Sequence, residues 1–457
     1  MQYYKPVGDF FAGDCMPFFH DGVFHLYYLL DENHHKALNG LGGHQWAHAS
    51  TRDLIHWQHH PLALAIDAEF EKSICTGSLF YHQGIYYAFY ATRLANWHQH
   101  LSWATSHDAI HFEKQPPNPL ASPPVGYSPL HFRDPHPFQD PETGLFHLLV
   151  TAMLEEPALA GRGGCLAQLT SPDLKRWTMQ APFLIPGYAD APECPDAFFW
   201  NGWYYLLFSN HLTAHYRMAQ HPLGPWLCPP IDTLDGTLAR VMKTAAFGPD
   251  RRLGVAWLGT RTDDKDDGKP QWGGHILFRE LVQHEDGTLG SKFVPEMLAV
   301  DQRQPPLAWA EVGTGGIQQA DQLHLRAWQS LQALPVTNLP PNFYLRMRLH
   351  PQPGSVRFGL RLRGSGNFAS GYDLTIHIPE RMVRLHNEAI YAVNGLDQPF
   401  TLEAVVKDDI IDVCIDQRRC IVNRCPELQG DRLFVFAHNA EVYVDEIEIR
   451  PWKTAVG

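Results

Sequence analysis

The N-terminal part of the chain repeats one pattern: an apolar run, a turn that contains glycine, and a second run rich in Tyr, Phe and Trp. This pattern predicts a β-hairpin, because the Asp-Gly, Gln-Gly, Thr-Gly and Asn-Gly pairs at its centre favour a tight turn between two strands. The pattern occurs five times, the last copy being weaker: Met16–Tyr28, Gly77–Tyr90, His136–Val150, Ala197–Phe208 and Ala245–Leu258.

A second unit follows each hairpin and reads as a strand, a Ser/Asp turn and an outer strand. Its copies, the last two degenerate, are Trp46–Trp57, Trp103–Phe112, Leu166–Trp177, Tyr216–Trp226 and Leu277–Leu289. Together the two units supply four strands, and tandem four-stranded units predict a five-bladed β-propeller. The alternative is a β-sandwich of unrelated hairpins, which the paired repetition of both units disfavours.

The pattern changes beyond a predicted linker around Asp301–Pro306. Short strands with period-two alternation follow, and they predict a second domain, a β-sandwich. These strands are Asn342–Leu349, Ser355–Leu362, Tyr372–Ile378, Phe400–Val406, Ile410–Ile415, Leu433–Ala437 and Val442–Ile449. We therefore expect an all-β protein without amphipathic helices: a catalytic five-bladed β-propeller at 1–298, a linker at 299–310 and a C-terminal β-sandwich at 311–457.

The net charge of the chain indicates which classes of partner it can bind. The formal net charge is -13, and no cluster of Lys and Arg interrupts this acidic background. Nucleic acids and anionic membranes are therefore not expected to bind. Aromatic residues make up 12% of the chain, which suits stacking on the flat faces of sugars and suits β-rich cores equally well.

The cysteines and the N-terminus bear on the cellular location. The eight cysteines form no C-x-x-C pair and no zinc-binding spacing, so we expect free, mostly buried thiols. Met1 is not followed by a basic and then apolar leader, and no apolar run is long enough to span a bilayer. These features predict a cytoplasmic protein.

Three acidic residues lie at or just before the first strands of repeats one, three and four: Asp14, Asp134 and Glu193. In a propeller the first strand of every blade reaches the central axis, so these acids are expected to converge. Cleavage of a glycosidic bond needs a proton donor for the leaving oxygen and a second carboxylate that attacks the anomeric carbon or activates water. Asp9 is the rival of Asp14, which is favoured because it directly precedes the strand.

Five motifs carry a resemblance to a known family: Arg133–Pro135, Glu193–Asp196, Trp46–Trp57, Thr76–Ser78 and Trp272–Leu281. On them the chain resembles glycoside hydrolase family 32, the β-fructofuranosidases, over nearly its whole length. The resemblance implies a propeller joined to a C-terminal β-sandwich. The chain departs from the family at the first acid, where Asp14 lacks the preceding Asn and the following Asn-Gly of the family motif.

The resemblance also implies roles for the acids. Asp14 would be the nucleophile, Glu193 the general acid/base, and Asp134 would hold sugar hydroxyls in the transition state. Arg133 would hold a hydroxyl or orient a neighbouring carboxylate. Trp46 is equally expected in the core of a blade. The residues predicted to bind substrate are Arg133, Gln45, Trp46, Ser78, Trp97 and Trp272.

The sequence therefore predicts a retaining glycoside hydrolase that cleaves fructofuranosyl, or related furanosyl, linkages in small sugars or oligosaccharides. A carbohydrate is the expected partner, no cofactor and no metal are expected, and the C-terminal domain braces the propeller or forms a homo-oligomer. Two alternatives stay open: an inverting, arabinanase-like propeller hydrolase, and a carbohydrate-binding protein without catalytic activity.

Overall fold

The protein is all-β, as predicted. The structure, a computed structural model, describes residues 1–35, 40–301, 308–309, 316–319, 322–337 and 339–453. Helical structure within these residues is limited to three short 3₁₀ segments, η1 (Asn33–His35), η2 (Thr262–Asp264) and η3 (Pro295–Met297). The predicted absence of amphipathic helices is thus confirmed for the described residues. No helix among them is long and apolar enough to cross a membrane.

The chain divides into two compact units. The N-terminal unit comprises 1–233, 239–259 and 271–288, and the C-terminal unit comprises 234–238, 260–270 and 289–457. Residues 302–307 and 310 of the predicted linker lie outside the described residues. All eight cysteines are free thiols, and six of them are buried, which confirms that prediction.

The five predicted hairpins of the N-terminal unit are confirmed. In each, two consecutive strands pair antiparallel across the predicted turn. The pairs are β1 (Phe10–His20) with β2 (Val23–Glu32), β5 (Ser73–His82) with β6 (Ile85–Arg93), β9 (Tyr127–Gln139) with β10 (Phe146–Leu154), β13 (Glu193–Trp200) with β14 (Trp203–Asn210), and β16 (Arg240–Phe247) with β17 (Arg251–Arg261).

Further strands extend each hairpin. They are β3 (Gln45–Thr51), β4 (Gln58–Leu64), β7 (Gln99–Ser106), β8 (Glu113–Lys114), β11 (Gly164–Ser171), β12 (Thr178–Met179), β15 (Thr213–Ala219) and β18 (Pro270–Gln283). In the fourth unit the outer edge is reduced to single bridges, such as Met218 with Leu227. This reduction matches the degenerate fourth repeat of the sequence.

The Ser/Asp turn of the second repeat unit is a hydrogen-bonded structure. Asp53 Oδ1 accepts two backbone N–H groups at 2.9 and 2.8 Å, and Thr51 Oγ1 accepts a third at 2.9 Å. These side chains satisfy donors that the turn withdraws from the strand ladder. The same bonding recurs with Ser106 and Asp108 and with Ser171 and Asp173.

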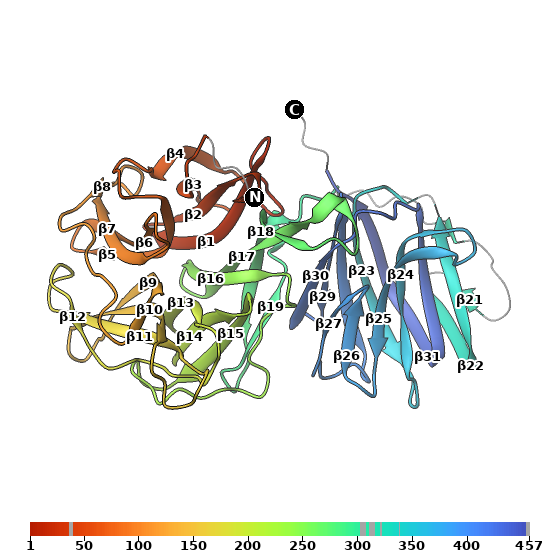
Figure 1. The fold of residues 1–457 in the computed structure, drawn as a ribbon. Helices are drawn as coiled ribbons and strands as arrows, with labels where there is room; N and C mark the ends of the chain where they lie inside the picture. Colours follow the sequence, from red (N-terminus) through yellow and green to blue (C-terminus); the bar gives the residue numbers. More distant parts are fainter. Residues whose placement is uncertain (36–39, 302–307, 310–315, 320–321, 338, 454–457) are drawn as a thin grey trace. The chain divides into compact units, whose positions relative to one another are not determined.

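The first strands of the five hairpins, here called the inner strands, contact one another in cyclic order: β1 with β5, β5 with β9, β9 with β13, β13 with β16, and β16 with β1. The ring is also closed by backbone pairing, because β1 pairs antiparallel with β18 at Ala12 and Gly274. The N-terminal strand thereby joins the last sheet of its unit (Figure 1).

Each inner strand carries a β-bulge at a corresponding place. The ladder of every hairpin skips one residue more on the inner strand than on its partner. A bulge leaves the extra residue unpaired, bends the strand and turns a side chain away from its regular direction. The pairs that flank the bulges are Ala12/Cys15, Ile74/Gly77, Arg133/His136, Glu193/Asp196 and Arg240/Lys243.

The C-terminal unit is built on one long strand, β31 (Arg432–Pro451). Its first half pairs with β24 (Arg357–Ser365), its second half with β23 (Phe343–Pro351), and much of its length with β22 (Gln322–Thr337). The unit's other strands are β19 (Leu289–Lys292), β20 (Ala308–Trp309), β21 (Gly316–Gln319), β25 (Ser370–His377), β26 (Met382–Leu385), β27 (Glu388–Ile390), β28 (Phe400–Lys407), β29 (Ile410–Ile415) and β30 (Arg419–Arg424).

One apolar core lies inside this unit. Alternate residues of β23, including Leu345, Met347 and Leu349, are almost fully buried. They pack with buried residues of β22, β24, β25, β28, β29 and β31 in a single cluster. The strict alternation of the sequence therefore places one face of each strand on a shared core.

Truncation of a leucine tests this core. Leu345→Ala should lower the free energy of unfolding by about 2–5 kcal/mol, because it leaves a cavity beside a fully buried position. Leu331 lies in the same unit and is 49% exposed. Leu331→Ala should therefore stay within about 0.5 kcal/mol of wild type. Urea unfolding followed by circular dichroism measures both, and equal losses would contradict the assignment of the core.

Candidate active site

The three predicted acids come together at the bulges of β1, β9 and β13. The backbone N–H of Cys194 donates to Asp134 Oδ2 at 3.1 Å, and the Cys194 thiol lies 3.8 Å from Asp14 Oδ2. The Arg133 guanidinium donates to Glu193 Oε1 at 2.7 Å and lies 3.5 Å from Asp134 Oδ2. One connected network therefore joins the three carboxylates, and we call these five residues the acid cluster.

Asp14 is held by two donors from other strands, β5 and β17. Thr76 Oγ1 donates to its Oδ2 at 2.6 Å, and Trp257 Nε1 donates to its Oδ1 at 2.8 Å. Burial raises the pKa of Asp14 to about 6, and the charges of Asp134 and Glu193 add to this rise, although both donated hydrogen bonds oppose it. The carboxylate is thus fixed in orientation and titrates near neutral pH.

Arg133 compensates the negative charge of the cluster. Burial alone would lower its pKa, but the charges of Asp134 and Glu193 outweigh burial and raise it. Its other terminal nitrogen is 3.1 Å from the ring of His131 and 3.3 Å from Gln99. The guanidinium is therefore held from two sides, by Glu193 on one and by His131 and Gln99 on the other.

Backbone conformation contributes to the cluster. Asp134 and Cys194 both have left-handed conformations, with φ of 53°. Residues with a Cβ adopt this region uncommonly, and such strain concentrates at functional sites. At Cys194 the unusual turn frees the N–H from the ladder and aims it at Asp134, whose carboxylate also accepts a hydrogen bond from Thr151 at 3.0 Å.

Asp9, the rival of Asp14, lies elsewhere. It is an exposed residue that precedes β1, and its backbone carbonyl accepts the N–H of Asn33 at 2.8 Å. None of the hydrogen bonds and ion pairs of the described residues connects its side chain to the acid cluster. The geometry therefore favours Asp14.

The prediction that Trp46 stacks on a sugar is wrong. Its side chain is fully buried, packs near Tyr27 and Tyr90, and donates from Nε1 to the carbonyl of Cys75 at 2.9 Å. An indole ring without exposed surface cannot contact a ligand. The alternative, that Trp46 belongs to the core, is correct. Its neighbour Gln45 is also buried, and its amide oxygen accepts a backbone N–H at 2.9 Å.

The two other predicted tryptophans are accessible. Trp97 is 60% exposed, and the Arg93 guanidinium lies over its ring at 4.4 Å. Trp272 is partly exposed and packs against Trp257, the donor to Asp14, at a ring distance of 5.4 Å. It also covers Gly13, where a Cβ atom would come within 2.1 Å of the ring. Trp272 therefore borders the acid cluster through Gly13 and Trp257.

Ser78 does not contact the acid cluster. Its hydroxyl is 3.1 Å from the ring of His136 and accepts the ammonium of Lys243 at 2.9 Å. These residues line a separate cavity on the other side of the bulges.

Among the residues that the structure describes, one group of side chains offers metal-ligand atoms. The ligand atoms of Asp31, His35 and His44 lie within 4.8 Å of one another, and His44 Nε2 is 3.0 Å from Asp31 Oδ1. However, Arg93 donates to Nε2 of His35 at 3.3 Å. A metal ion on Nδ1 would place a proton on Nε2, facing this donor, and would add positive charge beside a guanidinium. The group therefore fits a hydrogen-bonded Asp–His pair better than a metal centre.

Sequence reasoning missed three partners of the acids: Trp257, Thr151 and the thiol of Cys194. Thr76 was noted only for its resemblance to a family motif. Thr76 and Asp14 are each the second residue of their bulge. An alignment of the repeats would therefore have placed Thr76 at the position equivalent to Asp14. Trp257 lies on β17, in the weakest repeat, and nothing in its surroundings in the sequence marks it.

The comparisons with known proteins agree on one family. Residues 13–227 match the model of the glycosyl hydrolases family 32 N-terminal domain. The chain is 32% identical over 202 residues to the sucrose-6-phosphate hydrolase of Escherichia coli, covering 41% of this chain and 38% of that protein. It is 25% identical over 318 residues to the raffinose invertase of Escherichia coli, covering 63% of each.

Solved structures match over nearly the full length. The fructan 1-exohydrolase IIa of Cichorium intybus has a TM-score of 0.77 at 17% identity and covers 99% of this chain and 97% of its own. The sucrose-6-phosphate hydrolase of Lactobacillus gasseri has a TM-score of 0.72 at 17% identity, with 97% and 91% covered. At this identity the structural likeness shows the fold. Residues 13–227, which contain all three predicted acids, are thus similar to the N-terminal domain of glycosyl hydrolases family 32.

Proposed function

We propose that the protein is a retaining glycoside hydrolase that cleaves fructofuranosyl linkages in small sugars or oligosaccharides. The observation that carries this proposal is the acid cluster. It holds two carboxylates suited to nucleophilic attack and proton transfer, and a third that is buried and hydrogen-bonded. The names of the similar proteins, which specify sucrose-6-phosphate, raffinose and fructan, support a fructosyl substrate.

In this proposal Asp14 attacks the anomeric carbon and forms a glycosyl-enzyme intermediate. The two hydrogen bonds from Thr76 and Trp257 aim its carboxylate and keep part of it ionised despite burial. Glu193, oriented by Arg133, protonates the leaving oxygen and then deprotonates the water that hydrolyses the intermediate.

Asp134 has a different role in this proposal: it binds sugar hydroxyls and stabilises the transition state. Its position in the cluster is fixed by Thr151 and by the backbone of Cys194. Trp97 and Trp272 are proposed to contact the sugar, since both have exposed ring surface.

The architecture we propose for the described sheets is a five-bladed β-propeller followed by a C-terminal β-sandwich. The cyclic contacts of the inner strands and the pairing of β1 with β18 support the propeller. The core that the described strands of the second unit share supports the sandwich. The domain limits of 1–298 and 311–457, the cytoplasmic location and a homo-oligomer stay predictions of the sequence.

The first experiment measures fructose release from sucrose, raffinose, levan, inulin and short fructans, with arabino-oligosaccharides as the comparison. Asp14→Asn should lower kcat/KM about 10⁴-fold, because the nucleophile is lost. Glu193→Gln should lower it about 10²–10⁴-fold through loss of proton transfer. Asp9→Asn is the matched control and should keep wild-type activity.

The outcomes separate the alternatives. Release of arabinose instead of fructose, with an inverted anomer by NMR, would favour the arabinanase-like hydrolase. Sugar binding by calorimetry without turnover would favour a binding protein.

The pH dependence of kcat/KM tests the role of Asp14. The nucleophile acts only as the carboxylate, so activity should fall as pH drops below about 6, the raised pKa of Asp14. Thr76→Val removes a hydrogen bond that favours the carboxylate, so the acidic limb should move to higher pH. Thr143→Val removes the corresponding bond to Asp140 in a distant turn and should leave the limb in place. An unmoved limb in Thr76→Val would remove Asp14 as the titrating group.

A further inference from the structure

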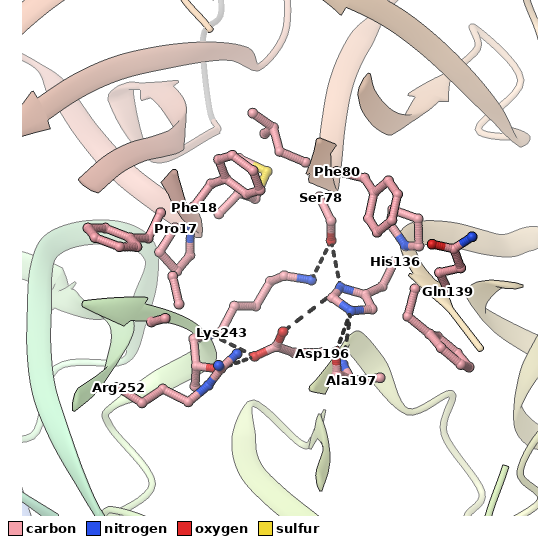
Figure 2. A pocket seen from close by; sticks show the side chains of 18 residues that line it. Pro17, Phe18, Ser78, Phe80, His136, Gln139, Asp196, Ala197, Lys243 and Arg252 are labelled. Carbon is pink, nitrogen blue, oxygen red and sulfur yellow. Dashed lines mark hydrogen bonds and ion pairs between the residues drawn. The ribbon is translucent and has the colours of Figure 1, made fainter. Parts of the chain in front are cut away.

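A cavity of about 260 Å³ lies within the ring of inner strands. All five inner strands contribute to its lining, together with Arg252 of β17. Figure 2 shows the side chains of Ser78, His136, Asp196 and Lys243 converging on it, with Arg252 beside Asp196. None of the three catalytic acids lines it, so the cavity is distinct from the acid cluster.

Two buried cations line this cavity without a carboxylate at ion-pairing distance. Lys243 is 3% exposed, and its ammonium donates to Ser78 Oγ at 2.9 Å and to the carbonyl of Pro195 at 2.7 Å. Arg252 is 9% exposed, and its Nε donates to Thr244 Oγ1 at 2.8 Å. Among the described residues, neither cation has a carboxylate within 4.0 Å, which leaves one ammonium N–H and the guanidinium fork without an acceptor.

The single carboxylate of the cavity is already used. Asp196 Oδ2 accepts the N–H of Thr244 at 2.8 Å and its hydroxyl at 2.5 Å. Burial lowers the pKa of Arg252 to about 10, with Asp196 opposing this change, so the arginine is still charged at neutral pH. Two cations and one carboxylate leave the cavity with one excess positive charge. The Phe198 ring, 3.4 Å from the Arg252 guanidinium, meets part of this charge, and an anion would stabilise it further.

His136 and Ser78 supply a neutral donor. His136 Nε2 lies 3.0 Å from the backbone nitrogen and 3.1 Å from the backbone oxygen of Ala197, and Nδ1 lies 3.1 Å from Ser78 Oγ. In the tautomer in which the Ala197 N–H donates to Nε2, Nδ1 carries the ring proton and donates to Ser78. Ser78 Oγ then accepts two hydrogen bonds, one from His136 and one from Lys243. Its own proton is left to donate to an occupant of the cavity. Burial and the charge of Lys243 lower the pKa of His136 to about 4, which keeps the ring neutral.

We propose that this cavity binds one small inorganic oxyanion, phosphate or sulfate, held by Lys243, Arg252 and Ser78. A guanidinium offers two parallel N–H donors that match two oxygens of one oxyanion, and the ammonium and hydroxyl approach from other inner strands. Donors on several walls suit a tetrahedral anion better than a flat carboxylate. The site does not depend on the proposed hydrolase activity.

The test is isothermal titration calorimetry of the full-length protein with sodium phosphate and with sodium sulfate. Both titrations are done at constant ionic strength, with chloride as the background anion. The expected result is saturable binding of one anion per chain and a rise of the thermal midpoint with its concentration. Crystals soaked in selenate should show its anomalous signal beside Arg252.

Two substitutions should change the affinity in opposite directions. Arg252→Gln removes the guanidinium fork and should weaken binding by about tenfold or more. Asp196→Asn removes the opposing charge and should tighten it. Arg176→Gln removes a positive charge from a side chain that is 82% exposed and should leave the affinity unchanged.

Absence of saturable binding in the wild type would overturn the proposal. An unchanged affinity in Arg252→Gln would also overturn it, since the anion would then occupy an adventitious surface site only. If Arg252→Gln does not fold, Asp196→Asn decides: tighter binding supports the site, and unchanged or weaker binding rejects it. Loss of fructose release in the earlier panel has no bearing on these results.

Discussion

One extra residue in each inner strand is the constraint on which the site depends. The bulge interrupts the ladder at a corresponding place in five hairpins, so the peptide groups there can bond elsewhere. Cys194 shows the effect, since its N–H leaves the ladder and binds Asp134. Without the bulges, residues on either side of each acid would alternate regularly between the two faces of a sheet, and their carboxylates would not share one network.

The bulges also separate two electrostatic environments along the same strands. Asp14 and Glu193 belong to an acidic cluster that a single arginine partly neutralises. A few residues further along, Pro17 and Asp196 line a cavity with an excess of positive charge. The two environments are connected through Lys243, which donates to the carbonyl of Pro195 between them. Opposite charges held on either side of one backbone segment favour each other across it, which lowers the cost of burying both.

The strands and turns were predictable because their determinants are local. A Gly-containing turn between two aromatic runs specifies a hairpin from about a dozen residues, and the Ser/Asp turn needs only four or five. The approach of the three acids was predictable from the repeat, since equivalent strands meet at one axis. The position of each acid relative to its bulge was not predictable. Asp14 is the second residue of its bulge, Asp134 is the first residue of its bulge, and Glu193 belongs to the pair that flanks the bulge.

Side-chain partners were less predictable, because they depend on contacts between distant repeats. Trp46 and Trp272 have similar sequence surroundings of glycine, histidine and small residues, yet the ring of one is enclosed by Tyr27 and Tyr90 and that of the other borders Asp14 through Gly13. Ser78 was predicted to bind substrate because it lies in a family motif. Its hydroxyl instead accepts a hydrogen bond from Lys243 of another inner strand, β16. A bulge shifts the alternation of side chains between the two faces of a strand. The sequence therefore does not show which side chains contact the neighbouring strands.

The pairing of β1 with β18 has a consequence for synthesis of the chain. On the ribosome β1 emerges before the other strands of its unit, whereas Gly274, its partner across the closure, follows Ala12 by 262 residues. Until then the nascent ring has two open strand edges, which are the surfaces most prone to pair with another chain. The order of translation therefore leaves this edge of β1 without its β18 partner until most of the N-terminal unit has been synthesised.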